Sequence, residues 1–137
     1  MHSRKTPQTM QDDPSYDDVV AEVCTELQSA AEAFLKQGVD KSNIVIDPGI
    51  GFAKRFEDNI TLLRNLPALH ALGFPVLLGT SRKSFIGRIT GRDAPRRVEG
   101  SLATVAWAFL QGTRFFRVHD VSQTIDLLSV LQTLGHP

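Results

Sequence analysis

Apolar residues follow two alternating patterns along the chain, one with helical spacing and one in short unbroken runs. The helical pattern predicts helices over residues 17–37, 59–72, 98–111 and 122–134, with one short helical turn over 84–91. The unbroken runs predict strands over residues 44–46, 76–78 and 115–118. Residues 1–16 are polar and predict an irregular loop. The alternation of strands and helices predicts parallel βαβ units in an α/β fold.

Single residues suggest where these elements begin and end. Asn59 and Ser122 are suitable N-caps for the second and last helices. Pro67 falls inside the second helix and is expected to kink or break it. The link over residues 53–58 is rich in charge and is expected to be exposed. The run 44–46 holds no polar residue and predicts a strand covered on both faces.

Three parallel strands with four helices make a thin domain with open sheet edges. Three strands cannot close into a barrel, so we expect part of the fold to be missing. A flavodoxin-like regulatory domain also fits this order of elements. It gives no reason, however, for charged side chains at the strand ends.

The composition narrows the classes of partner. The 137 residues are 42% hydrophobic, enough for one domain, and carry 15 basic and 15 acidic side chains. A formal charge of zero predicts no electrostatic attraction to nucleic acid or membrane. The single cysteine, Cys24, cannot form an internal disulfide, and no apolar run is long enough to span a bilayer. We therefore expect a cytoplasmic protein.

The first polar group lies after the run 44–46, where Asp47-Pro48-Gly49-Ile50-Gly51-Phe52 follows. A carboxylate beside two glycines is suited to binding an amino-pyrimidine edge. Asp-Pro-Gly is also common turn chemistry, in which Asp47 would cap its own backbone. Both interpretations stay open at this point.

Two basic groups follow the other two strands. Lys83 and Ser84 offer an ammonium and a hydroxyl that suit a phosphate or carboxylate, although a solvated basic turn is an equally plain explanation. Arg117 and His119 alternate along one strand, so both side chains should lie on one face and favour a diphosphate. The carboxyl ends of parallel strands share one side of a sheet, and these groups should converge there. The histidines do not show the spacing of a metal site.

The three segments resemble the dihydropteroate synthase family. The resemblance rests on the Asp47–Phe52 segment, on Ser81-Arg82-Lys83-Ser84-Phe85-Ile86-Gly87 and on Arg117-Val118-His119-Asp120-Val121, in this order and at these separations. The opening Met1-His2-Ser3-Arg4, with Pro7, Met10 and Gln11, is similar to the end of the family's fifth strand. The related pterin-dependent methyltransferases share the Asp loop, but the other two segments favour the synthase. The similarity covers essentially all 137 residues.

The resemblance implies an eight-stranded (β/α) barrel that joins p-aminobenzoate to a pterin-methyl diphosphate and releases diphosphate, in folate synthesis. Asp47 would pair with the pterin's amino-pyrimidine edge, and Lys83 would contact the pterin beside the p-aminobenzoate site. Phe52 and Ser84 would border that second site. Arg117 would stack on the pterin and, with His119, hold the diphosphate. Gly79 and Met1 are also placed among the substrate-binding residues, and sulfonamides are expected to mimic p-aminobenzoate.

Length is the main departure from the family. A barrel of this type takes about 250 residues, so residues 1–137 match a C-terminal half with roughly strands 6–8 and their helices. Mg²⁺ is expected to accompany the diphosphate, with most of its ligands in the missing half. We expect weak or no activity from this chain alone, and self-association that covers the open sheet. A non-catalytic pterin- or phosphate-binding remnant is the alternative. A smaller departure is Ala53, where the family usually has glycine.

Overall fold

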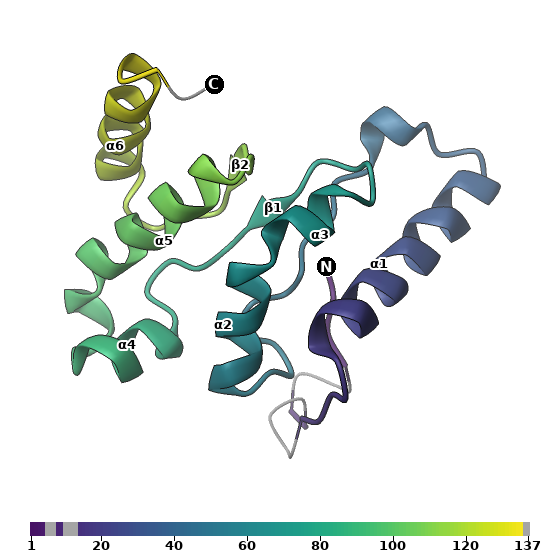
Figure 1. Cartoon of the computed structure of the whole chain (residues 1–137), viewed down its shortest axis with the longest axis horizontal. Coiled ribbons are helices and arrows are strands. Elements are labelled where there is room, and N and C mark those ends of the chain that lie inside the picture. Colours follow the sequence, from purple (N-terminus) through teal and green to yellow (C-terminus); the bar gives the residue numbers. More distant parts are fainter. Residues whose placement is uncertain (5–7, 10–13, 136–137) are drawn as a thin grey trace.

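The computed structural model describes residues 1–4, 8–9 and 14–135, in which helices and parallel strands alternate (Figure 1). The elements are α1 (Val19–Lys36), α2 (Phe56–Arg64), α3 (Leu66–His70), β1 (Leu77–Leu78), α4 (Ser84–Thr90), α5 (Val98–Leu110), β2 (Phe115–Phe116) and α6 (Val121–Thr133). Short 3₁₀ turns occur at Lys41–Asn43 and Ala94–Arg96. The expected order of helices is confirmed.

The parallel sheet is narrower than the sequence predicts. β1 pairs with β2 in parallel, with Leu77 opposite Phe115. The predicted strand over 44–46 is wrong in extent, because only Ile46 forms a bridge, to Val76. The predicted strand over 115–118 ends at residue 116. The opening segment is joined to the residue after Ile46 by one hydrogen bond, which the His2 amide donates to the Asp47 carbonyl at 2.8 Å.

The register gives the sheet two unlike faces. Asp47, Leu77 and Phe115 lie level on one face, because Ile46 is opposite Val76 and paired residues in parallel strands point the same way. The other face is buried beneath the helices, with Ile46 and Val76 inside the core. Val45 and Phe115 are 42% and 48% exposed on the first face. The expectation that the run 44–46 is covered on both faces is therefore wrong: one face is open.

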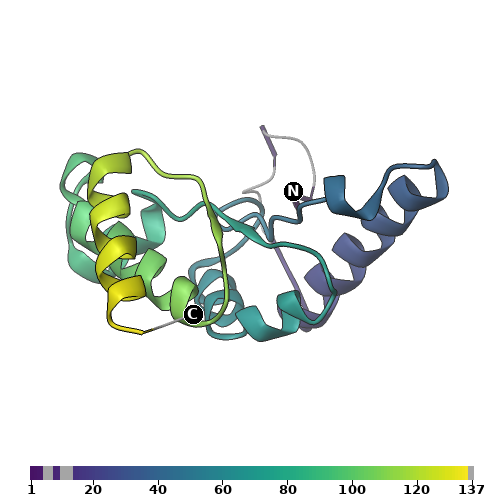
Figure 2. The same cartoon turned by 90° about the horizontal axis from the view of Figure 1, so that it is seen from above.

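Helices cover only the outer face. α1 packs on α2 and α3, α4 packs on α5, and α5 packs on α6. Figures 1 and 2 place α1 and α6 at opposite ends of the molecule, so the ring of helices does not close. In the part of the chain that the structure describes, no helix combines the length and the apolar content needed to cross a bilayer.

The helix ends correct several predictions from sequence. α2 begins three residues before Asn59, with Arg55 at the N-cap, and Asn59 is buried instead. α6 has Asp120 rather than Ser122 at its N-cap. The predicted break at Pro67 is confirmed, because α2 and α3 are separated at Asn65. The expectation that the whole link 53–58 is exposed is wrong, since Ala53 and Lys54 are 1% and 4% exposed.

Candidate functional site

A cavity of about 310 Å³ lies where the sheet strands end. Its lining residues are Phe52, Gly79, Ser81, Lys83, Arg117, Val118 and His119. They come from the three loops that follow Ile46, β1 and β2. These loops lie together because the carboxyl ends of parallel strands share one side of the sheet. The structure thus brings together five of the residues predicted as a site, namely Phe52, Gly79, Lys83, Arg117 and His119.

Asp47 adjoins this cavity and serves two purposes. One carboxylate oxygen, Oδ1, accepts a hydrogen bond from the Gly49 amide at 2.7 Å, which is the turn alternative considered above. The other, Oδ2, lies 3.9 Å from Nη2 of Arg117. The turn therefore fixes the carboxylate and leaves one oxygen directed at the cavity side, so the two interpretations are compatible.

Gly79 allows Arg117 to reach Asp47 across the sheet. A Cβ at Gly79 would lie 3.1 Å from Nη2 of Arg117, so the guanidinium lies almost directly on the backbone. Asp47, Gly79 and Arg117 belong to the same face of the sheet by register. A side chain at position 79 would force the Arg117 guanidinium to shift by a few tenths of an ångström.

Lys83 is held against the loop that carries Asp47. Its ammonium donates to the Ile50 carbonyl and lies 4.4 Å from the centre of the Phe52 ring. Burial lowers the pKa of the Lys83 ammonium to about 8, while the charge of Asp47 opposes this shift. A partly desolvated ammonium interacts more strongly with an anion than one in bulk water.

Ser81 connects the loop after β1 with the loop after β2. Its hydroxyl accepts from the His119 amide at 3.1 Å and lies 2.9 Å from Nδ1 of the His119 ring. Arg82 and Asp120 join the same two loops through an ion pair, with Nε of Arg82 3.1 Å from Oδ2. Nothing in the sequence gives Ser81 a role beyond its place in the segment that carries Lys83, because its contact to His119 spans 38 residues.

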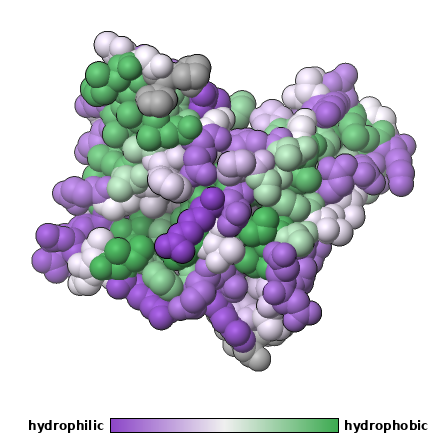
Figure 3. Space-filling model, in the orientation of Figure 1, coloured by the Kyte–Doolittle hydropathy of each residue, from purple (hydrophilic) through white to green (hydrophobic). Residues whose placement is uncertain are grey.

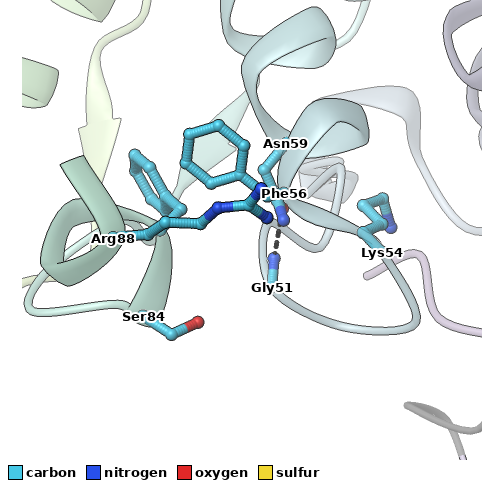
Figure 4. Close-up of a pocket in the computed structure, with 7 residues that line it drawn as sticks. Gly51, Lys54, Phe56, Asn59, Ser84 and Arg88 are labelled. Atoms are coloured by element: carbon cyan, nitrogen blue, oxygen red, sulfur yellow. Dashed lines mark hydrogen bonds between the residues drawn. The ribbon is translucent and has the colours of Figure 1, made fainter.

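A second hollow of about 470 Å³ adjoins the first, and Ser84 lies there (Figure 4). Its lining also includes Gly51, Lys54, Phe56, Asn59, Phe85 and Arg88. The Gly51 amide donates to Oδ1 of Asn59 at 2.6 Å, which fastens the loop to α2. Arg88 lies over the Phe56 ring at 4.2 Å. Residues adjacent in the chain line different hollows: Gly51 and Ser84 line the second one, while Phe52 and Lys83 line the first.

The opening segment is only partly placed. Met1 is 60% exposed and lines neither hollow, so its substrate-binding role stays a prediction. Pro7, Met10 and Gln11, which contributed to the resemblance, lie outside the described residues.

The described residues do not fit a magnesium site by themselves. Within residues 1–4, 8–9 and 14–135, no cluster of three or more His, Cys, Asp or Glu side chains could hold a metal ion. The arrangement instead suits an organic anion whose flat, hydrogen-bonding ring meets Asp47. Lys83 and Arg117 would meet its negative charge.

Comparison with known proteins gives concordant results. Residues 1–119 match the family model described as "Pterin binding enzyme". The dihydropteroate synthase of Neisseria meningitidis serogroup C is 44% identical over 137 residues, which are 98% of this chain and 48% of that protein. The chain spans about half the length of the curated relatives it matches.

Two solved structures extend the similarity to three dimensions. The Yersinia pestis dihydropteroate synthase, in complex with a sulfonamide drug, is 34% identical with a TM-score of 0.93, over 97% of this chain and 48% of that one. The Xanthomonas albilineans enzyme, in complex with 7,8-dihydropteroate, is 47% identical with a TM-score of 0.87, over 90% and 48%. The fold is therefore half of the (β/α) barrel of these proteins, as expected.

Proposed function

The chain belongs to the pterin binding enzymes, and on that basis we propose that it supplies the C-terminal half of a dihydropteroate synthase active site. The reaction joins p-aminobenzoate to 6-hydroxymethyl-7,8-dihydropterin diphosphate in folate synthesis. The observation that carries the proposal is the convergence of Asp47, Lys83 and Arg117 at the carboxyl ends of three parallel stretches.

Each of these side chains has a role that its contacts support. Asp47 keeps Oδ2 for the amino-pyrimidine edge of the pterin, since Oδ1 is occupied by the Gly49 amide. Lys83 borders both the pterin and the p-aminobenzoate, beside the Phe52 ring. The Arg117 side chain is 59% exposed on the cavity side, and its planar guanidinium can stack on a pterin ring.

Catalysis follows from where negative charge develops. The bond between the pterin methylene carbon and the diphosphate oxygen breaks, and the amine nitrogen of p-aminobenzoate forms the new bond to carbon and loses a proton. Arg117 and His119 stabilise the departing diphosphate because fixed positive or polar groups lower the barrier where charge accumulates. Ser81 holds His119 in position for this. Mg²⁺ would accompany the diphosphate, with most of its protein ligands supplied by the other half of the barrel.

Sulfonamides are expected to compete with p-aminobenzoate at the hollow that Ser84 and Phe56 line. A sulfonamide is bound by the Yersinia pestis relative. We place the protein in the cytoplasm, because its one cysteine, Cys24, has no partner for an internal disulfide.

We also propose that the 137-residue chain by itself self-associates. Val45 and Phe115 expose apolar surface on the open face of the sheet. A second apolar surface lies on α6, where Figure 3 shows hydrophobic side chains gathered at the upper left. Its exposed members are Val121, Ile125, Val130 and Leu134. Surfaces of this kind favour burial against a second copy.

Product formation tests the proposed function. Dihydropteroate is measured with pterin diphosphate, p-aminobenzoate and Mg²⁺, using the chain alone and mixed with the N-terminal half of a family member. We expect product in the mixture and little from the chain alone. Lys83→Ala should reduce the rate by about a hundredfold or more, whereas Lys36→Ala, at the exposed end of α1, should not. If neither sample forms product or binds pterin, the chain is a non-catalytic remnant.

A further inference from the structure

A buried lysine and histidine join the opening segment to the loop 47–54. Lys54 and His2 are each 4% exposed. The Lys54 ammonium lies 2.9 Å from Nδ1 of His2 and donates to the Phe52 carbonyl at 3.0 Å. In Figure 4, Lys54 lies on the other side of Gly51 from Ser84 and Arg88. Lys54 therefore lines the second hollow from the side opposite Ser84, while its ammonium is directed to His2 and the Phe52 carbonyl.

The loop has a conformation that requires support. Gly49, Gly51 and Ala53 have φ angles of +67°, +80° and +48°. Left-handed backbone is costly for a residue with a Cβ, so Ala53 is held there by its surroundings. Its carbonyl accepts from the Tyr16 hydroxyl at 2.8 Å. The loop that carries Asp47 and Phe52 therefore depends on contacts from other segments.

His2 contacts both the start of this loop and α1. Its amide donates to the Asp47 carbonyl at 2.8 Å. Its own carbonyl packs so closely on Gly49 that a Cβ there would be 1.8 Å away. On its far side, Nε2 lies 3.0 Å from Oε2 of Glu26, without the alignment of a hydrogen bond. His2 thus links Asp47 and Gly49 to a helix.

The two side chains are matched as donor and acceptor near neutral pH. Burial lowers the pKa of Lys54 to about 8 and, together with the charge of Lys54, lowers the pKa of His2 to about 4. Lys54 is then charged while the His2 ring is neutral and can accept. A buried ammonium is costly unless its hydrogen bonds are made, and the partners of Lys54 belong to the two segments that meet at Asp47 and Phe52.

We propose that Lys54 and His2 form a positioning pair, which holds Asp47 and Phe52 where the pterin binds. The proposal deepens the proposed function and rests on it for the identity of the ligand. Neither residue needs to touch the pterin, because Lys54 acts through the Phe52 carbonyl and His2 acts through the Asp47 backbone.

Amide hydrogen exchange, followed by NMR without ligand, tests the positioning itself. The Gly51 and Phe52 amides report on the loop, since they donate to Asn59 and to the Gly49 carbonyl. Lys54→Met should speed their exchange by about tenfold or more, as local opening predicts. The Val105 amide in α5 should not change, which separates a local effect from general loss of stability. Lys36→Met, an exposed change of the same kind, is the control. Unchanged exchange at Gly51 and Phe52 would overturn the proposal.

Binding to the protein assembled with an N-terminal half tests the consequence. Lys54→Met and His2→Phe should each weaken pterin binding by about tenfold and inorganic diphosphate binding by less than about twofold. The diphosphate is held by Arg117 and His119, outside the loop. The double variant should lose no more than either single variant, because the two side chains act as a unit.

Two outcomes separate the proposal from its premise. Equal weakening of pterin and diphosphate binding would overturn the positioning role and indicate a general loss of structure. If the unsubstituted assembly binds no pterin, the proposed function fails, while amide exchange still decides whether the pair holds the loop. His2→Phe repeats the exchange test from the other partner if Lys54→Met does not fold.

Discussion

Gly49 is required by contact as well as by conformation. A Cβ at this position would lie 1.8 Å from the His2 carbonyl oxygen, and the backbone has φ +67°. Gly91 has a similar φ of +71°, but a Cβ there would meet nothing within 4 Å. Gly91→Ala should therefore cost only the left-handed strain, about 1 kcal/mol. Gly49→Ala should cost about 3 kcal/mol or more, because the backbone must also shift.

Urea unfolding of the two alanine variants checks this difference. Equal losses of unfolding free energy would show that the contact between His2 and Gly49 does not constrain the loop, and that conformation alone accounts for the glycine.

His2 should make stability depend on pH. Its pKa is lowered from 6.5 to about 4, mainly by burial, so between these values the unfolded chain binds more protons than the folded chain. Stability should then fall as the pH decreases from 6.5 towards 4. The loss attributable to His2 should reach about 3 kcal/mol at pH 4. The measurement is urea unfolding at several pH values, for the unsubstituted chain and for His2→Phe.

Comparison with His2→Phe separates the contribution of His2 from that of other groups that titrate in this pH range. The lowered pKa of His70, also due mainly to burial, contributes in the same direction but equally to both proteins. The prediction is wrong if the two stability curves run parallel between pH 7 and pH 4.5.

Packing between helices depends on Gly100 in α5. A Cβ there would lie 2.3 Å from Cγ2 of Ile86 in α4. Alanine normally favours a helix over glycine by about 1 kcal/mol, but overpacking costs about 1–3 kcal/mol. Gly100→Ala should therefore destabilise the chain by about 1 kcal/mol, against the helix preference. Thermal unfolding checks the sign.

The same substitution in an Ile86→Ala background provides the control. Without Cγ2 of Ile86 the clash disappears, so Gly100→Ala should become neutral or stabilising there. Destabilisation of the same size in both backgrounds would exclude the contact as its cause.

The half-barrel as a whole should associate through the open face of its sheet. Phe115 and Val45 expose apolar surface on that face, and the unfolding midpoint of a self-associating chain rises with protein concentration. Phe115→Lys should shift sedimentation towards the monomer. Phe34→Lys, a matched change on the exposed surface of α1, should not.

Two results would contradict association through the sheet. A monomer at all concentrations would exclude self-association. If Val130→Lys dissociates the assembly and Phe115→Lys does not, the contact between copies lies on α6 instead.

The sequence by itself determined the order of elements and most of the residues that converge at the candidate site. Helical spacing of apolar residues located the helices, and Pro67 marked the break between α2 and α3, because a missing amide and a fixed ring act within a few residues. Asp47, Lys83 and Arg117 were predictable because parallel strands deliver their carboxyl ends to one side of a sheet. Their segments also sufficed for the resemblance to the family.

Only the tertiary structure decided which faces are covered and what supports the site. The extent of a strand depends on its neighbours, so the run 44–46 pairs at Ile46 alone and leaves Val45 exposed. Lys54 belongs to a charged stretch, yet it is buried because His2, 52 residues away, supplies an acceptor. Ser81 meets His119 across 38 residues in the same way. Such contacts depend on the register of the sheet and the packing of distant segments, which local pattern and propensity do not encode.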